Sequence, residues 1–443
     1  MLIEFTVGNF CSFRDQATLS MVAANLKSKN KSLDENNVAV LPNQPNLLTS
    51  AAIYGPNASG KSNLIGALRF MRNFILHSSE ATAATGGIGV DSFRLNPRSA
   101  QEPSYFEAAF IIEDQRYRYG FEVTDELVVR EWLYTVPKTR EVKLFERTPD
   151  GMSVGTSFRE GRKLMEQTRP NALFLTVVAQ FNGKIAQRIV GWFRSLGIAS
   201  GLNDMGMKIY TEQKLVDGEQ AEEIVRLVTR LDLGITGLRT EKGAVEDPIL
   251  PPDMPAELQR AMRTIIQHNK ETGFAVDVKT VHLSYDDDGN VAGDVEFEMD
   301  LDESSGTRKL FAMAAPLLET LAEGRVMVVD ELDSRLHTSM TKELVKLFND
   351  FRTNPKHAQL IFSAQDTNLL DYELFRRDQI WFIEKDSRGA SQLYSLAEFK
   401  GIRNDLFLEK SYMQGRFGAV PYVNALPAMI RESHAVYGAQ EEE

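Results

Sequence analysis

Apolar and polar residues alternate along much of the first third of the chain. The alternation covers residues 3–7 and 17–21, and the segment between them, residues 9–14, interrupts it with the sequence NFCSFR. A period of two is typical of strands with one buried face, so we predict two strands joined by a turn. Three longer alternating runs over 104–136 predict an antiparallel meander.

A different pattern follows the polar, Asn- and Lys-rich segment 25–47, which we predict to be a loop. Residues 47–54 form a short and almost continuous apolar run, which predicts a buried strand. The helix predicted to begin near Lys61 carries apolar residues around most of its circumference as far as residue 75. A helix of this kind belongs in a core.

The middle of the chain changes to a helical period. We predict helices over 157–272, with one apolar face visible at 219–231, and a break at the prolines 248, 251, 252 and 255. A hairpin is predicted at 277–300, with its turn at the sequence DDDGN, residues 286–290.

The last third alternates between helices and strands, which indicates an α/β fold. We predict helices at 307–323 and 339–352, strands at 325–330, 359–364, 379–384 and 392–396, and a helical tail.

Composition adds mainly exclusions. The chain has 443 residues, of which 43% are hydrophobic and 25% charged, as in ordinary globular proteins. No apolar run is long enough to cross a bilayer, and residues 1–5 lack the features of a signal peptide. The single cysteine, Cys11, excludes an internal disulfide and multi-cysteine metal sites. We therefore expect a cytoplasmic protein without membrane contact.

The net charge of −12 argues against a surface that is covered with basic residues and binds nucleic acid, although a local basic patch is compatible with this charge. Basic clusters at 138–143 and 375–377 could contact DNA, but solvated surface is the simpler interpretation because no aromatic residues interleave them.

The strongest motif lies between the predicted buried strand and the helix. Residues 55–62, GPNASGKS, match G-x-x-x-x-G-K-[ST]. Its glycines allow backbone N–H groups to surround phosphate oxygens, Lys61 adds a point charge, and Ser62 can bind Mg²⁺. The motif predicts ATP and Mg²⁺ as ligands. The residues predicted to contact them here are Gly55, Pro56, Asn57, Ala58, Ser59, Gly60, Lys61, Ser62 and Asn63.

A P-loop of this kind needs a further carboxylate near the magnesium ion. Residues 325–331, RVMVVDE, form an apolar run that ends in two carboxylates. We predict that Asp330 is the magnesium residue, together with Ser62. Glu331 is predicted to be the general base that orients the attacking water.

Two further segments fit the same chemistry. Ser305 and Gly306 open an apolar helix and could present a hydroxyl and backbone N–H groups to a phosphate, whereas the alternative is a plain N-cap. After the two carboxylates, residues 331–337 read ELDSRLH. His337 could approach the nucleotide or have a structural role.

The order of these motifs resembles the ABC-type ATPase heads of the SMC, Rad50 and RecF branch, which also carry an N-F-x-S-F turn, here at 9–13. Within that branch the chain is similar to the RloA/AbiL-type (AAA15-like) abortive-infection ATPases, on the basis of DQIWFIEK and GRFGAVP. The resemblance implies an α/β head with a P-loop core sheet, a β meander and a helical insertion. The corresponding divisions are 1–156, 157–272 and 273–443.

The resemblance also implies how the site is completed. Two heads would close on two ATP molecules, with each P-loop facing Ser305 and Gly306 of the other copy and with Asp333 at the dimer contact. Gln365 stands where the family usually has a catalytic histidine that contacts the γ-phosphate. Because glutamine has no titratable proton, turnover would be slow or the site tuned for switching. Cys11 stands where related heads often have a nucleotide-contacting arginine.

We therefore predict an ATPase whose ATP-dependent association, as a homodimer or higher homo-oligomer, switches a partner effector in anti-phage defence. The stretch after Gln365 is too short for a nuclease domain, so the effector, a nuclease or toxin, would be a separate protein. One alternative is an SMC- or RecF-like repair ATPase that grips DNA, for which DNA would stimulate hydrolysis. Another is an ATP-binding scaffold with little turnover, in which Glu331→Gln would leave a negligible rate unchanged.

Overall fold

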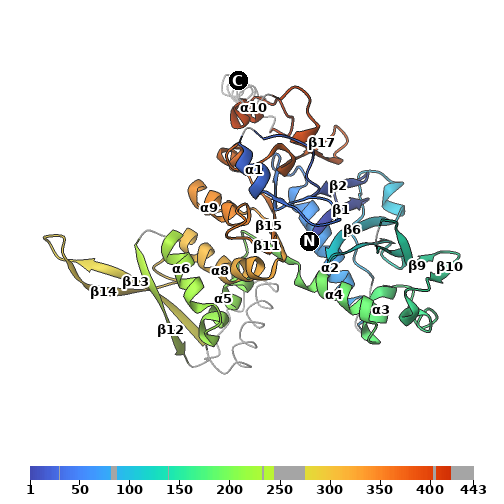
Figure 1. Ribbon diagram of the computed structural model, residues 1–443, viewed down its shortest axis with the longest axis horizontal. Helices are drawn as coiled ribbons and strands as arrows, with labels where there is room; N and C mark the ends of the chain where they lie inside the picture. Colours follow the sequence, from blue (N-terminus) through green and yellow to red (C-terminus); the bar gives the residue numbers. More distant parts are fainter. Residues whose placement is uncertain are drawn as a thin grey trace, which may run out of the picture.

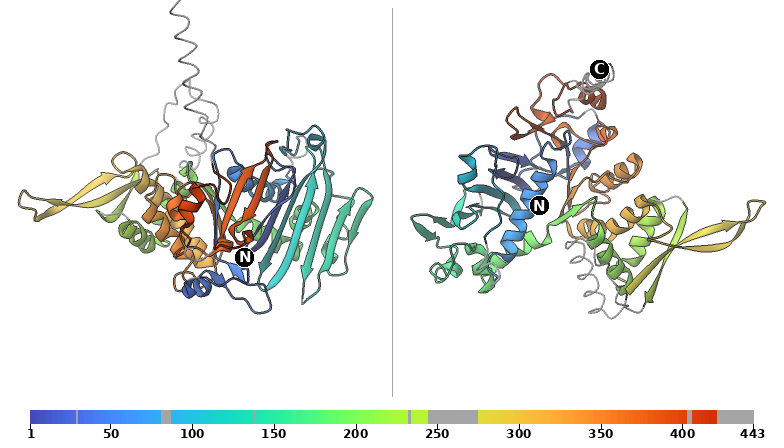
Figure 2. Two further views of the ribbon diagram at one scale, coloured as in Figure 1. Left: turned by 90° about the horizontal axis from the view of Figure 1, so that it is seen from above. Right: turned by 180° about the vertical axis from the view of Figure 1, so that it is seen from behind.

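The computed structural model describes residues 1–28, 30–80, 87–137, 139–231, 234–243, 275–402 and 406–420. Figure 1 shows three parts along the long axis of the molecule. A large antiparallel sheet lies at one end, a central α/β part follows, and a lobe with a projecting hairpin lies at the other end. Figure 2 shows that the hairpin and the antiparallel sheet remain at opposite ends when the molecule is turned.

Six strands form the central sheet, in the order β11-β15-β16-β5-β17-β18. All neighbours are parallel except β17 and β18. β5 and β16 are buried over their whole length, as expected of continuous apolar runs in a sheet covered on both faces. The strands are β5 (Ser50–Tyr54), β11 (Gly197–Ser200), β15 (Val326–Asp330), β16 (Gln359–Ser363), β17 (Ile380–Lys385) and β18 (Ser391–Ser395).

Seven antiparallel strands form the second sheet, in the order β10-β9-β8-β7-β6-β1-β2. The predicted N-terminal pair thus extends the predicted meander, because β1 pairs with β6. The strands are β1 (Leu2–Gly8), β2 (Ala17–Ser20), β6 (Ser104–Ile112), β7 (Gln115–Val123), β8 (Val128–Val136), β9 (Val142–Thr148) and β10 (Gly151–Val154).

The helix that follows the P-loop lies between these two sheets. Its side chains Leu64, Leu68 and Met71 share one apolar core with Ile53 of the central sheet and Phe106 of the antiparallel sheet. Burial on most sides explains the apolar circumference of its sequence. The helices of this side are α2 (Lys61–His77), α3 (Phe174–Gln180) and α4 (Lys184–Ser195).

A second core covers the opposite face of the central sheet. It combines Tyr54 and Phe362 of the sheet with Leu310, Leu344 and residues near the C-terminal end of the described chain. The helices that contribute to it are α8 (Ser305–Glu323), α9 (Thr338–Phe348) and α10 (Leu408–Met413). Parallel strands covered by helices on both faces form the α/β fold predicted from the sequence.

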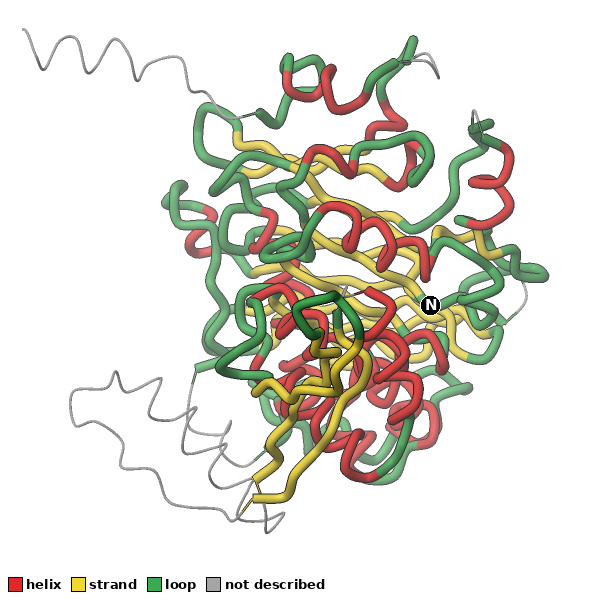
Figure 3. The backbone as a smooth tube through the Cα atoms, turned by 90° about the vertical axis from the view of Figure 1, so that its left-hand side faces the viewer, coloured by secondary structure: helices red, strands yellow, loops and turns green. Residues whose placement is uncertain are grey.

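The lobe has a smaller core of its own. Ile224 and Val228 of one lobe helix pack with Val278 of the lobe sheet and with Phe311 and Ala315 of α8. Figure 3 shows the lobe hairpin in front, with the central sheet behind it. The lobe elements are α5 (Met205–Asp217), α6 (Ala221–Leu231), β12 (Ile235–Gly243), β13 (Ala275–Tyr285) and β14 (Val291–Glu298).

Several predicted elements need correction. The segment predicted as a loop at 25–47 contains a short helix, which Asn30 caps by accepting a hydrogen bond from the backbone N–H of Ser32. Two short strands that follow the helix pair with each other in an antiparallel ladder. Its elements are α1 (Lys31–Asn36), β3 (Val38–Ala39) and β4 (Leu47–Leu48). The helical period predicted over 157–272 is wrong at β11 and β12, since β11 joins the central sheet beside β15.

Other boundaries shift less. The helix predicted at 339–352 ends at Phe348. The proline break at 248–255 and the end of the tail, 421–443, lie outside the described residues. The hairpin predicted at 277–300 is confirmed by the antiparallel pairing of β13 with β14. Within the described part of the chain, no helix is long and apolar enough to span a membrane.

Candidate nucleotide-binding site

The P-loop connects the C-terminal end of β5 to α2. Gly60 is the N-cap of α2 with φ of 118°, a left-handed conformation that side chains with a Cβ rarely adopt. A Cβ on Gly55 would lie 2.2 Å from the carbonyl oxygen of Ile383, so this position also requires glycine. Both motif glycines therefore have a steric reason in this fold.

A group of small polar side chains supports the loop from behind. The Ser391 hydroxyl donates to the Ser59 carbonyl oxygen at 2.5 Å and also bonds the Ser12 hydroxyl at 2.7 Å. The Asn63 amide donates to the Ser12 oxygen at 2.7 Å. The turn at 9–13 thus lies against the P-loop, and the Asn63 side chain bonds this turn.

The lysine of the motif is buried at the mouth of the loop. The Lys61 ammonium donates to the carbonyl oxygens of Gly55 and Pro56, at 2.6 and 3.2 Å. Burial lowers the pKa of Lys61, and the negative charges of Asp330 and Glu331 act in the opposite direction. Its charge thus interacts favourably with the carboxylates at the end of β15. Ser62, the next residue, is exposed.

Asp330 and Glu331 lie at the C-terminal end of β15, and Ser363 at the end of β16 bridges them. The Ser363 hydroxyl donates to Asp330 Oδ1 at 2.5 Å and accepts from the backbone N–H of Glu331 at 2.8 Å. Glu331 has a φ of 54°, which is uncommon for a residue other than glycine. The bridge holds this backbone in place.

Gln365 and Asp333 are joined to the same group. The Gln365 amide donates to Glu331 Oε1 at 3.4 Å. Asp333 Oδ2 accepts from the backbone N–H groups of Gln365 and Asp366, at 2.8 and 2.6 Å. Asp333 therefore fixes the loop after β16 within its own chain.

Sequence reasoning missed Lys309, which no motif marked. This side chain is completely buried, and its ammonium donates to the carbonyl oxygens of Glu331, Leu332 and Ser334. Burial, followed by the positive charge of Arg335, lowers the pKa of Lys309 to about 8. Ser363 and Ser391 were missed as well, because their importance depends on which strands become neighbours.

Ser305 and Gly306 are not brought to the P-loop of their own chain. They open α8, where Ser304 acts as N-cap and accepts a hydrogen bond from the backbone N–H of Thr307 at 3.1 Å. The Ser305 side chain is exposed. Neither residue lines the cavity beside the P-loop.

That cavity measures about 620 Å³ and is bounded by the P-loop on one side and by the C-terminal end of the described chain on the other. Gln365, Glu384 and Tyr412 are among its lining residues. Glu384 accepts from the backbone N–H of Ala419 at 2.7 Å, and the Tyr412 hydroxyl donates to the Ala419 carbonyl at 2.7 Å. The segments 378–385 and 415–420, quoted for their family resemblance, therefore meet beside the P-loop.

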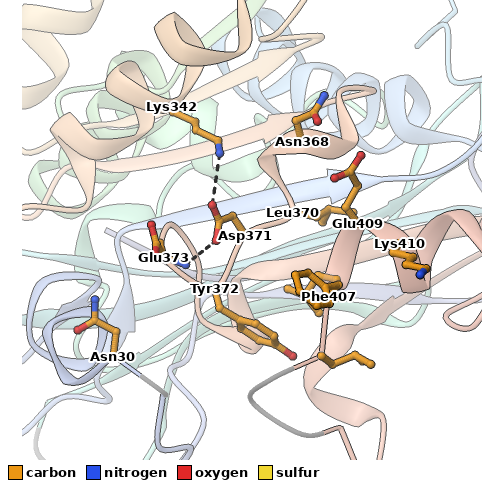
Figure 4. A pocket seen from close by; sticks show the side chains of 12 residues that line it. Asn30, Lys342, Asn368, Leu370, Asp371, Tyr372, Glu373, Phe407, Glu409 and Lys410 are labelled. Atoms are coloured by element: carbon orange, nitrogen blue, oxygen red, sulfur yellow. Dashed lines mark hydrogen bonds and ion pairs between the residues drawn. The ribbon is translucent and has the colours of Figure 1, made fainter.

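A second cavity, of about 1000 Å³, contains none of the predicted site residues. Figure 4 shows Lys342 paired with Asp371, with Tyr372 and Phe407 nearby. The segment 364–373 contributes to both cavities, because its first residues line the P-loop side and its later residues line this one.

The donor set fits magnesium bound mainly through nucleotide. Within the described residues there is no cluster of three or more metal-binding side chains. Magnesium usually takes one or two protein ligands plus substrate phosphates and water. Ser62 and Asp330 supply a hydroxyl and a carboxylate, which suits that pattern.

Two other candidates take structural roles. The His337 side chain caps α9 by accepting from the backbone N–H of Ser339. Arg376 is buried in ion pairs with Asp378 and Asp34, so the DNA contact considered for cluster 375–377 does not apply to it. Arg140 and Lys143 of the other cluster are exposed, whereas Lys138 lies outside the described residues.

A family model described as "AAA domain, putative AbiEii toxin, Type IV TA system" matches residues 50–371. No curated protein matches the chain.

Among solved structures, the chain is similar to the SMC head domain from Thermotoga maritima, with 14% identity, coverage of 89% of this chain and 98% of that one, and a TM-score of 0.38. It is also similar to an SMC head bound to the C-terminal winged-helix domain of ScpA, with 13% identity, 89% and 97% coverage and a TM-score of 0.43. It is similar as well to the recombination mediator protein RecF with ATP, with 14% identity, coverage of 89% of this chain and 97% of that one, and a TM-score of 0.34.

Proposed function

This chain belongs to the AAA-domain family that matches residues 50–371, and we propose that it binds ATP with Mg²⁺ at the P-loop and hydrolyses it. The observation that carries this proposal is the Ser363 bridge. It fixes the Asp330 carboxylate and the backbone of Glu331 on the strand pair next to β5, which carries the P-loop.

Each residue has a role that follows from its position. The backbone N–H groups of 57–62 and the Lys61 ammonium bind the phosphates, which draws the ammonium away from the carbonyls of Gly55 and Pro56. Ser62 and Asp330 hold the magnesium ion, which when bound neutralises charge on the phosphates. Glu331 accepts a proton from the attacking water, and Gln365 orients the Glu331 carboxylate through its amide.

The site is completed by a second copy of the chain. Ser305 is exposed at the N-terminus of α8 and lies outside the P-loop cavity of its own chain. We propose that it contacts the γ-phosphate of ATP bound by the other copy. ATP then favours the closed dimer, because a ligand shifts the population toward the state that binds it better.

The wider role rests on family membership and resemblance. We propose that the closed dimer, or a larger homo-oligomer built from it, controls a separate effector protein in anti-phage defence in the cytoplasm. The family description names a putative AbiEii toxin of a type IV toxin–antitoxin system, which supports a role in a defence system of this kind. A repair ATPase that grips DNA and a scaffold with little turnover remain the competing functions.

Mass photometry of Glu331→Gln with and without Mg-ATP tests the proposal, with Lys61→Ala as the control. We expect the mass to double with ATP and to stay constant in Lys61→Ala. A monomer in all samples would contradict the shared site. Added duplex DNA that stimulates hydrolysis by the unmodified protein would instead favour the repair function.

A further inference from the structure

Helix α8 belongs to two cores at once. Leu310 and Met313 face the core beneath the central sheet, whereas Phe311 and Ala315 face the core of the lobe. These positions form two adjacent faces of one helix. A movement of the lobe relative to the central sheet must therefore move α8 as well.

The attachment of α8 to the lobe is polar as well as apolar. Pro316 lies inside the helix and has no N–H group to donate to the carbonyl of Ala312. The Thr211 hydroxyl of α5 donates to this carbonyl instead, at 2.9 Å. The Tyr210 hydroxyl, also on α5, donates to Glu319 at 2.5 Å. Helices α5 and α8 are thus fastened together at two levels.

The opposite attachment runs from α8 to the loop that carries Glu331. The Lys309 ammonium bonds Leu332 O and Ser334 O at 2.7 Å each, Ser334 Oγ at 2.9 Å and Glu331 O at 3.1 Å. A buried cation surrounded by carbonyl oxygens is costly to separate from them, because neither side has water to replace the lost bonds. The loop must follow the lysine.

Residues before α5 are tied to the same loop. The carbonyl oxygen of Gly201, directly after β11, accepts from the Ser334 hydroxyl at 3.0 Å and from the Arg335 guanidinium at 2.7 Å. Arg335 also pairs with Asp204, directly before α5, at 2.8 Å. The N-terminal ends of α5 and α8 are therefore both connected to residues 331–335.

We propose that Lys309 is a positioning residue, which couples engagement of the α8 N-terminus by a second copy to the placement of Glu331 in its own chain. The proposal rests on the proposed function, since it needs Ser305 to contact ATP held by the other copy. Ser305 lies one helical turn before Lys309. Closure at Ser305 shifts α8, and the lysine carries the catalytic loop with it, so that hydrolysis at one site depends on ATP at the other.

The test compares Lys309→Met with the unmodified protein. Methionine has a similar length and no charge, and Lys309→Gln is the graded variant because its amide keeps two N–H donors. Lys346→Met is the matched control, since this lysine lies on the exposed side of α9 and pairs only with Glu343 among the described residues. Four quantities are measured: the melting temperature, the affinity for a fluorescent ATP analogue, the ATP-dependent dimer mass in a Glu331→Gln background, and kcat with its Hill coefficient.

We expect Lys309→Met to bind the analogue and to dimerise as the unmodified protein does, with kcat at least about tenfold lower and the Hill coefficient reduced from near two to near one. Lys309→Gln should be intermediate and Lys346→Met unchanged. An unchanged kcat and Hill coefficient, or a loss that appears only in the affinity for ATP, would overturn the coupling role.

The variant Ser334→Ala tests the coupling role of Lys309 even if the Lys309 variants do not fold. This variant keeps the lysine and removes one of its partners together with the bond to Gly201. We expect a smaller fall in kcat and in the Hill coefficient with an unchanged melting temperature, and full activity would contradict the proposal. If the unmodified protein neither dimerises with ATP nor hydrolyses it, the proposed function itself has failed.

Discussion

The central sheet and the lobe hairpin both contain strands with apolar residues, but these strands lie in opposite environments. All five residues of β5 are buried, whereas all eight residues of β14 are exposed, although both segments contain apolar residues at strand spacing. The difference arises from the neighbours. β5 has a strand on each side and a core on each face, whereas β14 pairs with β13 at the edge of a three-stranded sheet.

The two regions also differ in where chemistry can be placed. The central strands are parallel, so the loops after β5, β15 and β16 emerge at one edge and bring Lys61, Glu331 and Gln365 together. The hairpin carries a dense acidic sequence at 286–288 and 294–298 but no predicted site residue. The lobe can therefore influence catalysis through the elements that connect it to the central part, which are α8 and the contact of Arg335 with Asp204 directly before α5.

The largest difference is expected for carboxylates. Glu331→Gln should lower kcat by roughly 10²–10⁴-fold, the usual contribution of a general base, while ATP binding is retained. Glu298→Gln on β14, an equally conservative change in the other region, should leave kcat unchanged. Steady-state phosphate release measures both. A similar loss in the two variants would show that the contrast between the regions is wrong.

Apolar truncation should show the same contrast in stability. Phe362 of β16 is fully buried, so Phe362→Ala should lower the free energy of unfolding by about 3–5 kcal/mol. Phe297 of β14 is 39% exposed, and Phe297→Ala should cost about 1 kcal/mol. Denaturant unfolding compares the two. Equal costs would mean that the hairpin is covered in solution.

Glycine replacement tests the backbone in the two regions. Gly55→Ala forces a Cβ to within 2.2 Å of the Ile383 carbonyl and should destabilise by about 1–3 kcal/mol. Gly237→Ala in β12 meets Val281 at 3.9 Å, an ordinary contact, so a change within about 0.5 kcal/mol is expected. Thermal unfolding without nucleotide separates the two. Tolerance of alanine at Gly55 would contradict the P-loop geometry.

The smallest expected effect concerns the hydroxyl between β15 and β16. Ser363→Ala removes bonds to Asp330 and to the Glu331 backbone, which should cost about 1–2 kcal/mol of stability and lower kcat. Ser284→Ala in the hairpin removes one exposed bond to Gly293 and is the control. A kcat for Ser363→Ala equal to that of the control would show that the Ser363 bridge does not contribute to catalysis.

Much of the central part could be predicted because its signals are local. The strand–loop–helix around 55–62 and the apolar run into Asp330 depend on neighbouring residues alone, and the structure places both at one edge of the sheet. The roles assigned to these residues, and the domain divisions at 156 and 272, remain predictions. Gln365 was placed by resemblance and lies within 3.4 Å of Glu331.

Other features could not be predicted because they depend on distant partners. Ser391 supports the P-loop only because β18 ends the central sheet beside it, and Lys309 becomes important only once the loop after β15 folds over it. β11 has just four residues within a segment of helical period, and its pairing with β15 decides its conformation. Such residues carry no motif, so the sequence reveals them only as ordinary polar or apolar positions.

The central claim is that each ATP site uses Glu331 of one copy and Ser305 of another. Mixing Glu331→Gln with Ser305→Arg tests this most directly, because each variant alone is expected to be inactive. Half of the mixed population would be heterodimers in which one site has both residues, so a rate above that of either variant alone should return. This rate is at most about one quarter of the unmodified rate, because the copy that supplies Glu331 carries Ser305→Arg on its own α8. If the mixture stays inactive although heterodimers form, or if Ser305→Arg alone is fully active, the shared site is contradicted.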